Sequence, residues 1–133
     1  TALKPGDVVT SLQLPLSPTG MVGKYFKLGR NKSSDLSIIG VTVLGFPDET
    51  AASGYRIKLA MASVAPVPLV VEKVEELLAA RPVTDETIAD AAKAAMEGCT
   101  PIDDVRASAR YRKIMARNLS QKALTEIWNQ LGR

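Results

Sequence analysis

The sequence predicts an α+β fold in which an antiparallel sheet of three to four strands packs against about three helices. Two patterns predict this class. Up to about residue 61, apolar residues alternate with polar ones or form β-branched runs, whereas after about residue 69 they recur at helical spacing. Strands and helices segregated along a chain pack most simply as an antiparallel sheet with helices on one face.

The first strand is predicted over residues 7–14. Its apolar residues alternate partly with polar ones, and Pro15 ends the run because proline cannot donate a hydrogen bond to a sheet ladder. A turn follows, and residues 21–28 then form a second predicted strand. Tyr25 and Leu28 are its expected anchors in the core.

Two further strands are predicted after a polar loop at residues 29–35. Residues 36–46 are rich in β-branched side chains and are bounded by Gly45 and Pro47, which favours a largely buried strand. Residues 55–61 show the clearest alternation of apolar and polar side chains in the sequence. The expected strands therefore extend from about residue 7 to about residue 61.

Three helices are predicted over residues 69–131. The first must end before the proline at position 82, since proline disrupts a helix interior. The second is expected to begin at an N-cap, Thr84, and to end with Gly98 just beyond its last turn. The third is expected to begin at a second cap, Ser108, and to end near residue 131.

Composition limits the chemistry that this chain can perform. Its 133 residues, 46% hydrophobic and 23% charged, are typical of one globular domain, and neither a membrane-spanning run nor a signal peptide is recognisable. A soluble, cytoplasmic protein is expected. There is no histidine and only one cysteine, Cys99, which excludes Ser-His-Asp and Cys-His centres, the usual zinc sites and an iron–sulfur cluster of its own.

Three segments, taken in order, resemble the C-terminal domain of the FAD-binding subunit of molybdenum hydroxylases, the xanthine dehydrogenase and carbon monoxide dehydrogenase family. The resemblance extends from Asp7 to the last predicted helix, and its strength lies in the order and spacing of short motifs. The segments are DVVTSLQLP at 7–15, KYFKLGRNKSSDLSIIGVTV at 24–43 and PIDDVRASARYR at 101–112.

The resemblance implies an accessory role in an oxidoreductase. In the family, a substrate is oxidised at a molybdopterin centre, and electrons pass through 2Fe-2S clusters to FAD and then to an acceptor. This domain would not be catalytic alone. Its implied partners are an upstream FAD-binding domain and the iron–sulfur and molybdopterin subunits or domains. A chain that begins at Thr1 is accordingly expected to be a single domain from a larger flavoprotein subunit.

The resemblance also implies three partial contacts with FAD. Val8 and Val9 match an apolar pair in the family's first strand, and Lys27 matches a lysine near the end of its second. Apolar surface suits a flavin ring, and a lysine can donate to a flavin oxygen or balance negative charge. The alternatives are half-buried strand residues for the two valines and a solvated charge for Lys27. Most of the FAD site must lie elsewhere, because no Gly-x-Gly-x-x-Gly motif is present.

The loop after Lys27 holds Arg30, Lys32 and Asp35, a mixture of charges that is typical of a solvated turn. Asp35 precedes the next predicted strand, where a short acidic side chain can accept hydrogen bonds from loop amides. We therefore expect Asp35 to fix the shape of the loop rather than to act in catalysis.

Asp103 and Asp104 form a carboxylate pair before the last helix. Such a pair can serve acid–base chemistry or a metal, but acids that enter a helix usually interact with its N-terminal dipole. Tyr111 and Arg112 match a Tyr-Arg pair of the family's last helix. Tyr111 is expected to pack, and Arg112 is expected to bind the chain before the helix.

Residues 106–122 contain six basic residues and no acidic one, which raises the possibility of nucleic-acid binding. Only 5% of all residues are aromatic, so little is available for base stacking. A solvated or subunit-facing helix is the favoured interpretation. The competing function is a cofactor-free protein–protein interaction module that uses the helical half.

Overall fold

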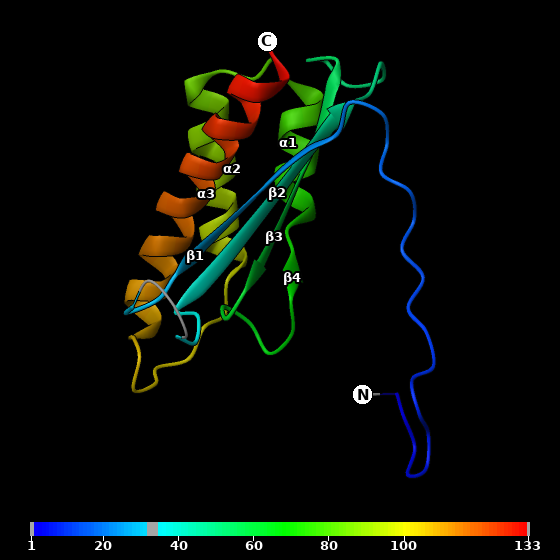
Figure 1. Ribbon diagram of the computed structural model, residues 1–133. Helices are drawn as coiled ribbons and strands as arrows, with labels where there is room; N and C mark the ends of the chain where they lie inside the picture. The colour runs from blue at the N-terminus through cyan, green and yellow to red at the C-terminus, as the bar shows by residue number, and fades with distance from the viewer. Residues whose placement is uncertain (1, 32–34, 133) are drawn as a thin grey trace.

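The computed structural model describes residues 2–31 and 35–132 and contains one sheet covered by helices on one face (Figure 1). The sheet is antiparallel with strand order β1-β2-β3-β4. The strands are β1 (Val22–Leu28), β2 (Ile39–Pro47), β3 (Tyr55–Ala62) and β4 (Leu69–Val70), and the helices are α1 (Glu72–Ala80), α2 (Asp85–Gly98) and α3 (Ala109–Leu131). The predicted α+β class is confirmed.

The register of the sheet separates its two faces. In β2, four residues at alternate positions face the helices and are buried: Ile39, Val41, Val43 and Gly45. Their neighbours point to the opposite face, which no helix covers (Figure 1). This second face is called the open face below. It is formed mainly by alternate residues of β1, β2 and β3.

The core lies between the helix-facing side of the sheet and the three helices. Large aliphatic side chains come from the strands and from all three helices, and several buried alanines of α2 and α3 let these two helices approach each other closely. The fully buried residues of α2 and α3 include Ala91, Ala92, Ala95, Ala116, Ala123, Leu124 and Ile127.

Two predicted helix caps are confirmed. The Thr84 side chain accepts a hydrogen bond from the Thr87 amide, and the Thr87 hydroxyl accepts one from the Thr84 amide, which completes a capping box. The Ser108 hydroxyl accepts a hydrogen bond from the Tyr111 amide at the start of α3. These bonds satisfy amides that a helix end leaves without partners.

The strand predicted over residues 7–14 is wrong. These residues lie in an exposed N-terminal arm, residues 2–20, which leaves β1 at its Val22 end and runs clear of the sheet (Figure 1). Leu12 and Leu14 are 86% and 88% exposed. Alternation alone does not make a strand, because its backbone groups need a partner strand, and the described residues offer none to this segment.

The start of the first helix also differs from the prediction. Leu69 and Val70 pair with β3 as the short strand β4, and the Val71 amide donates to the Leu59 carbonyl at 3.0 Å. The helix therefore begins only at Glu72. The available edge of β3 accounts for the difference, since it offers these residues backbone partners that an isolated helix start lacks.

Two further details were predicted incorrectly. Gly98 is the last residue of α2, and the cap is Cys99, whose backbone is extended. Tyr25 is 56% exposed and lies on the open face, whereas Phe26 and Leu28 pack against the core. Successive strand residues point to opposite faces, so Tyr25 and Leu28 are on opposite sides of the sheet.

A glycine in β2 permits α3 to lie close to the sheet, which yields a stability prediction. A Cβ at Gly45 would stand 2.7 Å from Leu131 Cδ1 and 2.9 Å from Ile127 Cγ2. Gly45→Ala should therefore lower the free energy of unfolding by about 1–3 kcal/mol, because the end of α3 must shift. Chemical denaturation measures this loss.

The control for that measurement is Gly98→Ala, in which the new Cβ would lie 3.8 Å from Val71 Cγ1, an ordinary contact. This variant should be neutral or stabilising by up to about 1 kcal/mol. Equal effects of the two substitutions would show that the approach of α3 does not depend on Gly45.

Candidate functional site

The candidate site begins on the open face of β1. Lys27 and Tyr25 point to this face from alternate positions, and Lys27 lies opposite Gly40 of β2 in the sheet register. The Lys27 side chain is exposed and has no hydrogen bond or ion pair with any described residue. Its charge is therefore available to a ligand or to solvent.

Tyr25 was not predicted as a site residue, but the structure places it beside Lys27. Its ring crosses Gly40, where an added Cβ would lie 2.9 Å from Tyr25 Oη and 3.1 Å from Cε2. The glycine thus allows the aromatic ring to lie close to the β2 backbone. The sequence could have indicated this position, because residues two apart in a strand, such as 25 and 27, lie on the same face of the sheet.

Val8 and Val9 lie in the N-terminal arm and are 80% and 58% exposed. The arm runs clear of the sheet (Figure 1), so the structure does not bring the two valines together with Lys27. Two exposed valines in an extended segment are suited to contact with another surface.

Asp35 has the structural role predicted for it. Its Oδ2 accepts hydrogen bonds from the amides of Arg30 and Asn31, at 2.5 and 3.2 Å. The bond from the Arg30 amide is the main cause that holds the pKa of Asp35 below its usual value. The carboxylate thus fixes the start of the β1–β2 loop. Lys32, which was grouped with this loop, lies outside the described residues.

Arg112 is the most connected charged residue at the end of the sheet where β1 ends and β2 begins, the same end as Lys27. Its side chain is 4% exposed, and Nη1 donates to the carbonyls of Ile38 and Ser63 at 2.5 and 2.9 Å. Nη2 forms an ion pair with Asp104 Oδ1 at 2.8 Å. The expected binding of Arg112 to the chain before its helix is confirmed, and the contacts with residues 38 and 63 are additional.

The acidic pair before α3 is structural. Asp103 accepts a hydrogen bond from the Ala109 amide at 2.6 Å, which is the expected interaction with a helix N-terminus. Asp104 accepts from the amides of Arg106 and Ala107 and also pairs with Arg112. The Arg106 amide is the largest of these influences, and together they lower the pKa of Asp104 far below its usual value.

The basic stretch at residues 106–122 was predicted to form a solvated or subunit-facing helix, and the structure agrees with this in part. Four basic side chains of the stretch are exposed, namely Arg110, Lys113, Arg117 and Lys122. Tyr111, which was expected to pack, is 43% exposed, so that expectation is wrong. Arg112 faces inward instead, because it is the residue whose side chain the loop carbonyls bind.

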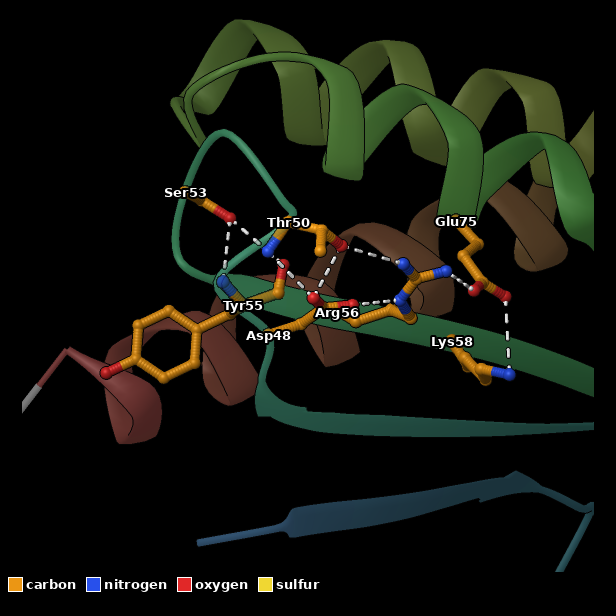
Figure 2. A network of polar contacts seen from close by, with 7 residues as sticks. All are labelled: Asp48, Thr50, Ser53, Tyr55, Arg56, Lys58 and Glu75. Atoms are coloured by element: carbon orange, nitrogen blue, oxygen red, sulfur yellow. Dashed lines mark hydrogen bonds and ion pairs between the residues drawn. The ribbon is translucent and has the colours of Figure 1, made fainter. Parts of the chain in front are cut away.

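A second polar network joins the β2–β3 turn to α1 (Figure 2). Arg56 lies between Asp48 and Glu75, pairing with Asp48 through Nε and with Glu75 Oε1 through Nη1 at 2.9 Å. Lys58 also contacts Glu75, at 3.7 Å. These charged side chains bind one another across the edge of β3. The cluster therefore holds α1 against the β2–β3 turn.

The described residues contain little that resembles a catalytic centre. Within residues 2–31 and 35–132, no group of three or more His, Cys, Asp or Glu side chains could hold a metal ion. The Cys99 thiol is buried, and burial raises its pKa to about 11, which disfavours the thiolate. Among the described helices, none combines the length and the hydrophobicity that a membrane-spanning helix needs.

Comparison with known proteins identifies the family. The model of the CO dehydrogenase flavoprotein C-terminal domain matches residues 24–127. This chain belongs to that family. The medium chain of carbon monoxide dehydrogenase from Hydrogenophaga pseudoflava is 30% identical over 128 residues, which cover 96% of this chain and 44% of the relative.

Solved structures of CO dehydrogenases share the fold. A crystal structure of a Cu,Mo-CO dehydrogenase in its cyanide-inactivated form superimposes with a TM-score of 0.84 and 25% identity, covering 98% of this chain and 44% of that one. The structure of the Hydrogenophaga pseudoflava enzyme that lacks the Mo-pyranopterin moiety of its molybdenum cofactor superimposes with a TM-score of 0.78 and 32% identity. This match covers 88% of this chain and 40% of that one. The present chain thus spans less than half of the proteins that it matches.

The network of Figure 2 generates a prediction about acid stability. Hydrogen bonds from the Thr50 hydroxyl and Arg56 lower the pKa of Asp48 from 3.8 to about 2. A carboxylate with a depressed pKa stabilises the fold above its unfolded value and loses that contribution as pH falls through the folded value. The melting temperature of the wild type should therefore fall between about pH 4 and pH 2.

Asp48→Asn should melt lower than wild type at pH 7 and show a shallower decline in acid, while Asp104 continues to contribute. Glu49→Gln is the control, because Glu49 is exposed and has no partner among the described residues. Thermal melts from pH 2 to pH 7 make the comparison. An unchanged acid slope in Asp48→Asn would contradict the assignment.

Proposed function

We propose that this chain is the accessory C-terminal domain of an FAD-binding subunit in an oxidoreductase that combines molybdenum, iron–sulfur and flavin centres. In this role it closes part of the flavin pocket and braces the subunit. The observation that supports the proposal most directly is family membership together with Lys27, which the family resemblance assigned to FAD and which stands unpartnered on an open sheet face.

The open face suits one wall of a flavin pocket. Lys27 offers an ammonium group, and the exposed Tyr25 ring offers aromatic surface about one strand repeat away. In our proposal, Lys27 donates to a flavin oxygen, and Tyr25 excludes water from the same wall. A bound FAD would supply electron transfer, whereas the residues of this chain bind and orient it.

The phosphates of FAD need a different part of the protein. Phosphate-binding loops are rich in glycine and lead into a helix N-terminus. The described helices begin after Val71, Thr84 and Ser108, and the segments that lead into them contain no glycine. We therefore propose that the main FAD-binding domain lies upstream in a longer subunit.

The N-terminal arm gives Val8 and Val9 a place in this proposal. Its apolar side chains are largely exposed, and its backbone forms no strand pairing with the described residues. Docking of the arm onto the upstream domain would bury these side chains and satisfy its backbone. The two valines would then reach the flavin from that domain while Lys27 approaches from the sheet.

The Lys27 assignment predicts a defect in cofactor retention. In the complete subunit, Lys27→Met should weaken FAD binding by about 1–3 kcal/mol, because it removes one charge-assisted contact and keeps most of the apolar stem. The melting temperature of the apo domain should barely change, since Lys27 is exposed and unpartnered. FAD release measured by absorbance tests the prediction.

Lys93→Met is the matched control, because Lys93 is an exposed residue of α2, on the opposite side of the sheet from the open face. It should retain FAD as the wild type does. If Lys27→Met also held FAD at wild-type strength, Lys27 would be a solvated charge, and the cofactor-free interaction module would become the stronger interpretation.

The isolated 133-residue chain should be colourless after purification. Val8, Val9 and Lys27 supply too little contact surface to hold a dinucleotide without its phosphate-binding loops. Gel filtration followed by absorbance near the flavin bands gives the measurement. Stoichiometric flavin in the protein peak would place the main FAD site within this chain and overturn the assignment.

A further inference from the structure

A cavity of about 450 Å³ opens between the three loops that Arg112 connects. Its lining comes from the β1–β2 loop, the β3–β4 loop and the segment between α2 and α3, with Arg112 of α3 at one side. Cavities of about 300–1,000 Å³ are large enough to enclose a small ligand or a short part of a bound chain. None of the candidate flavin contacts, Val8, Val9, Tyr25 and Lys27, lines this cavity.

Several polar groups in this cavity lack protein partners. The hydroxyls of Ser37, Ser63 and Thr100 form no hydrogen bond with the described residues. Arg112 Nε is a buried nitrogen without a hydrogen-bond partner among the described residues, whereas Nη1 donates to two carbonyls and Nη2 pairs with Asp104. Ser63 and Thr100 are exposed and Ser37 is partly buried, so these hydroxyls are accessible to an occupant of the cavity that supplies donors and acceptors.

Backbone conformation sets Ser63 apart from its neighbours. Its φ is 66°, and no other described non-glycine residue has a positive φ. This left-handed conformation costs roughly 1–3 kcal/mol, and such residues cluster at binding sites. The Ser63 carbonyl accepts from Arg112 Nη1, which helps to hold the residue in this conformation at the wall of the cavity.

The mouth of the cavity is apolar and exposed. Ile102 is 74% exposed and Leu36 is 64% exposed, and both line the cavity. Val67 and Val105, from the same two loops that supply Pro66 and Ile102, are 68% and 89% exposed. Large apolar side chains gathered on adjoining loops are a feature of protein–protein contact surfaces.

The charge of the lining favours an acidic occupant. Two guanidinium groups, Arg106 and Arg112, face one carboxylate, Asp104, which leaves one positive charge in excess. The Arg106 side chain is 29% exposed and reaches Asp104 through Nη1 alone. Its remaining donors have no partner among the described residues and can bind a carboxylate from outside the chain.

We propose that this cavity binds an extended segment of a partner subunit, which inserts an apolar side chain between Leu36 and Ile102 and places an adjacent Asp or Glu beside Arg106. A peptide fits better than a small ligand because it supplies backbone donors and acceptors for the three hydroxyls and further apolar area for the exposed rim. The inference rests on the proposed function, in which this chain works within a multi-subunit enzyme.

Cross-linking in the assembled enzyme tests the location of the contact. Ile102 of the full-length flavin subunit is replaced by a photo-cross-linking phenylalanine analogue, the enzyme is assembled with its partner subunits, and cross-linked peptides are sequenced. We expect a peptide from another subunit that contains an apolar residue next to an acidic one. Cross-links confined to the flavin subunit itself would overturn the inference. A small molecule found bound in the cavity in place of a peptide would also overturn it.

Binding measurements test the chemistry. Ile102→Asp and Arg106→Glu should each weaken the affinity of the flavin subunit for its partners about tenfold or more. Arg117→Glu, the same charge reversal at an exposed site on α3, should have little effect. Thermal melting identifies any variant that fails to fold, and Ile102→Asp should fold normally because its side chain is mostly exposed.

The two proposals fail in different ways. Suppose that the wild-type subunit binds FAD and assembles, and that both variants bind the partner subunits with unchanged affinity. The proposed docking of a partner segment would then be wrong, and the proposed function would stand. A wild-type subunit that neither retains FAD nor joins partner subunits would reject the proposed function itself.

Discussion

The guanidinium of Arg112 is the contact on which one whole end of this domain depends. Three loops meet there, and each offers it an acceptor: the carbonyls of Ile38 and Ser63 and the carboxylate of Asp104. The planar guanidinium spreads its donors over separate nitrogens and can bind all three at once, whereas a lysine ammonium would have to bind them from a single atom. Because the side chain of Arg112 is buried and binds all three, the loops depend on one another through it.

The opposite end of the sheet is held by packing and by a separate set of polar contacts. Gly45 allows Ile127 and Leu131 to approach β2, and the Tyr55 hydroxyl donates to the Leu131 carbonyl at 3.0 Å. Arg56 joins the neighbouring turn to α1 through Asp48 and Glu75 (Figure 2). With both ends fixed, the strands between them form a rigid platform, and the open face can present Tyr25 and Lys27 in a constant geometry.

Features with a local cause could be predicted from the sequence. The strands near 21–28 and 55–61, the caps at Thr84 and Ser108 and the loop-fixing role of Asp35 depend on neighbouring residues, and the structure contains all of them. Features that depend on a distant partner could not. Residues 7–14 alternate like a strand but find no described strand to pair with, whereas Leu69 and Val70 pair with β3 despite a helical pattern.

The candidate site follows the same division. The family resemblance made Lys27 a candidate, and Tyr25 could have been placed beside it because residues two apart in one strand lie on the same face. The cavity beside Arg112 could not be predicted, since its lining comes from residues 36 to 112 and exists only when three loops meet. Arg112 positions these loops and also lines the cavity, so the stability of this end and the shape of the cavity depend on the same side chain. An occupant that contacted all three loops would therefore stabilise their arrangement as well as attach to them.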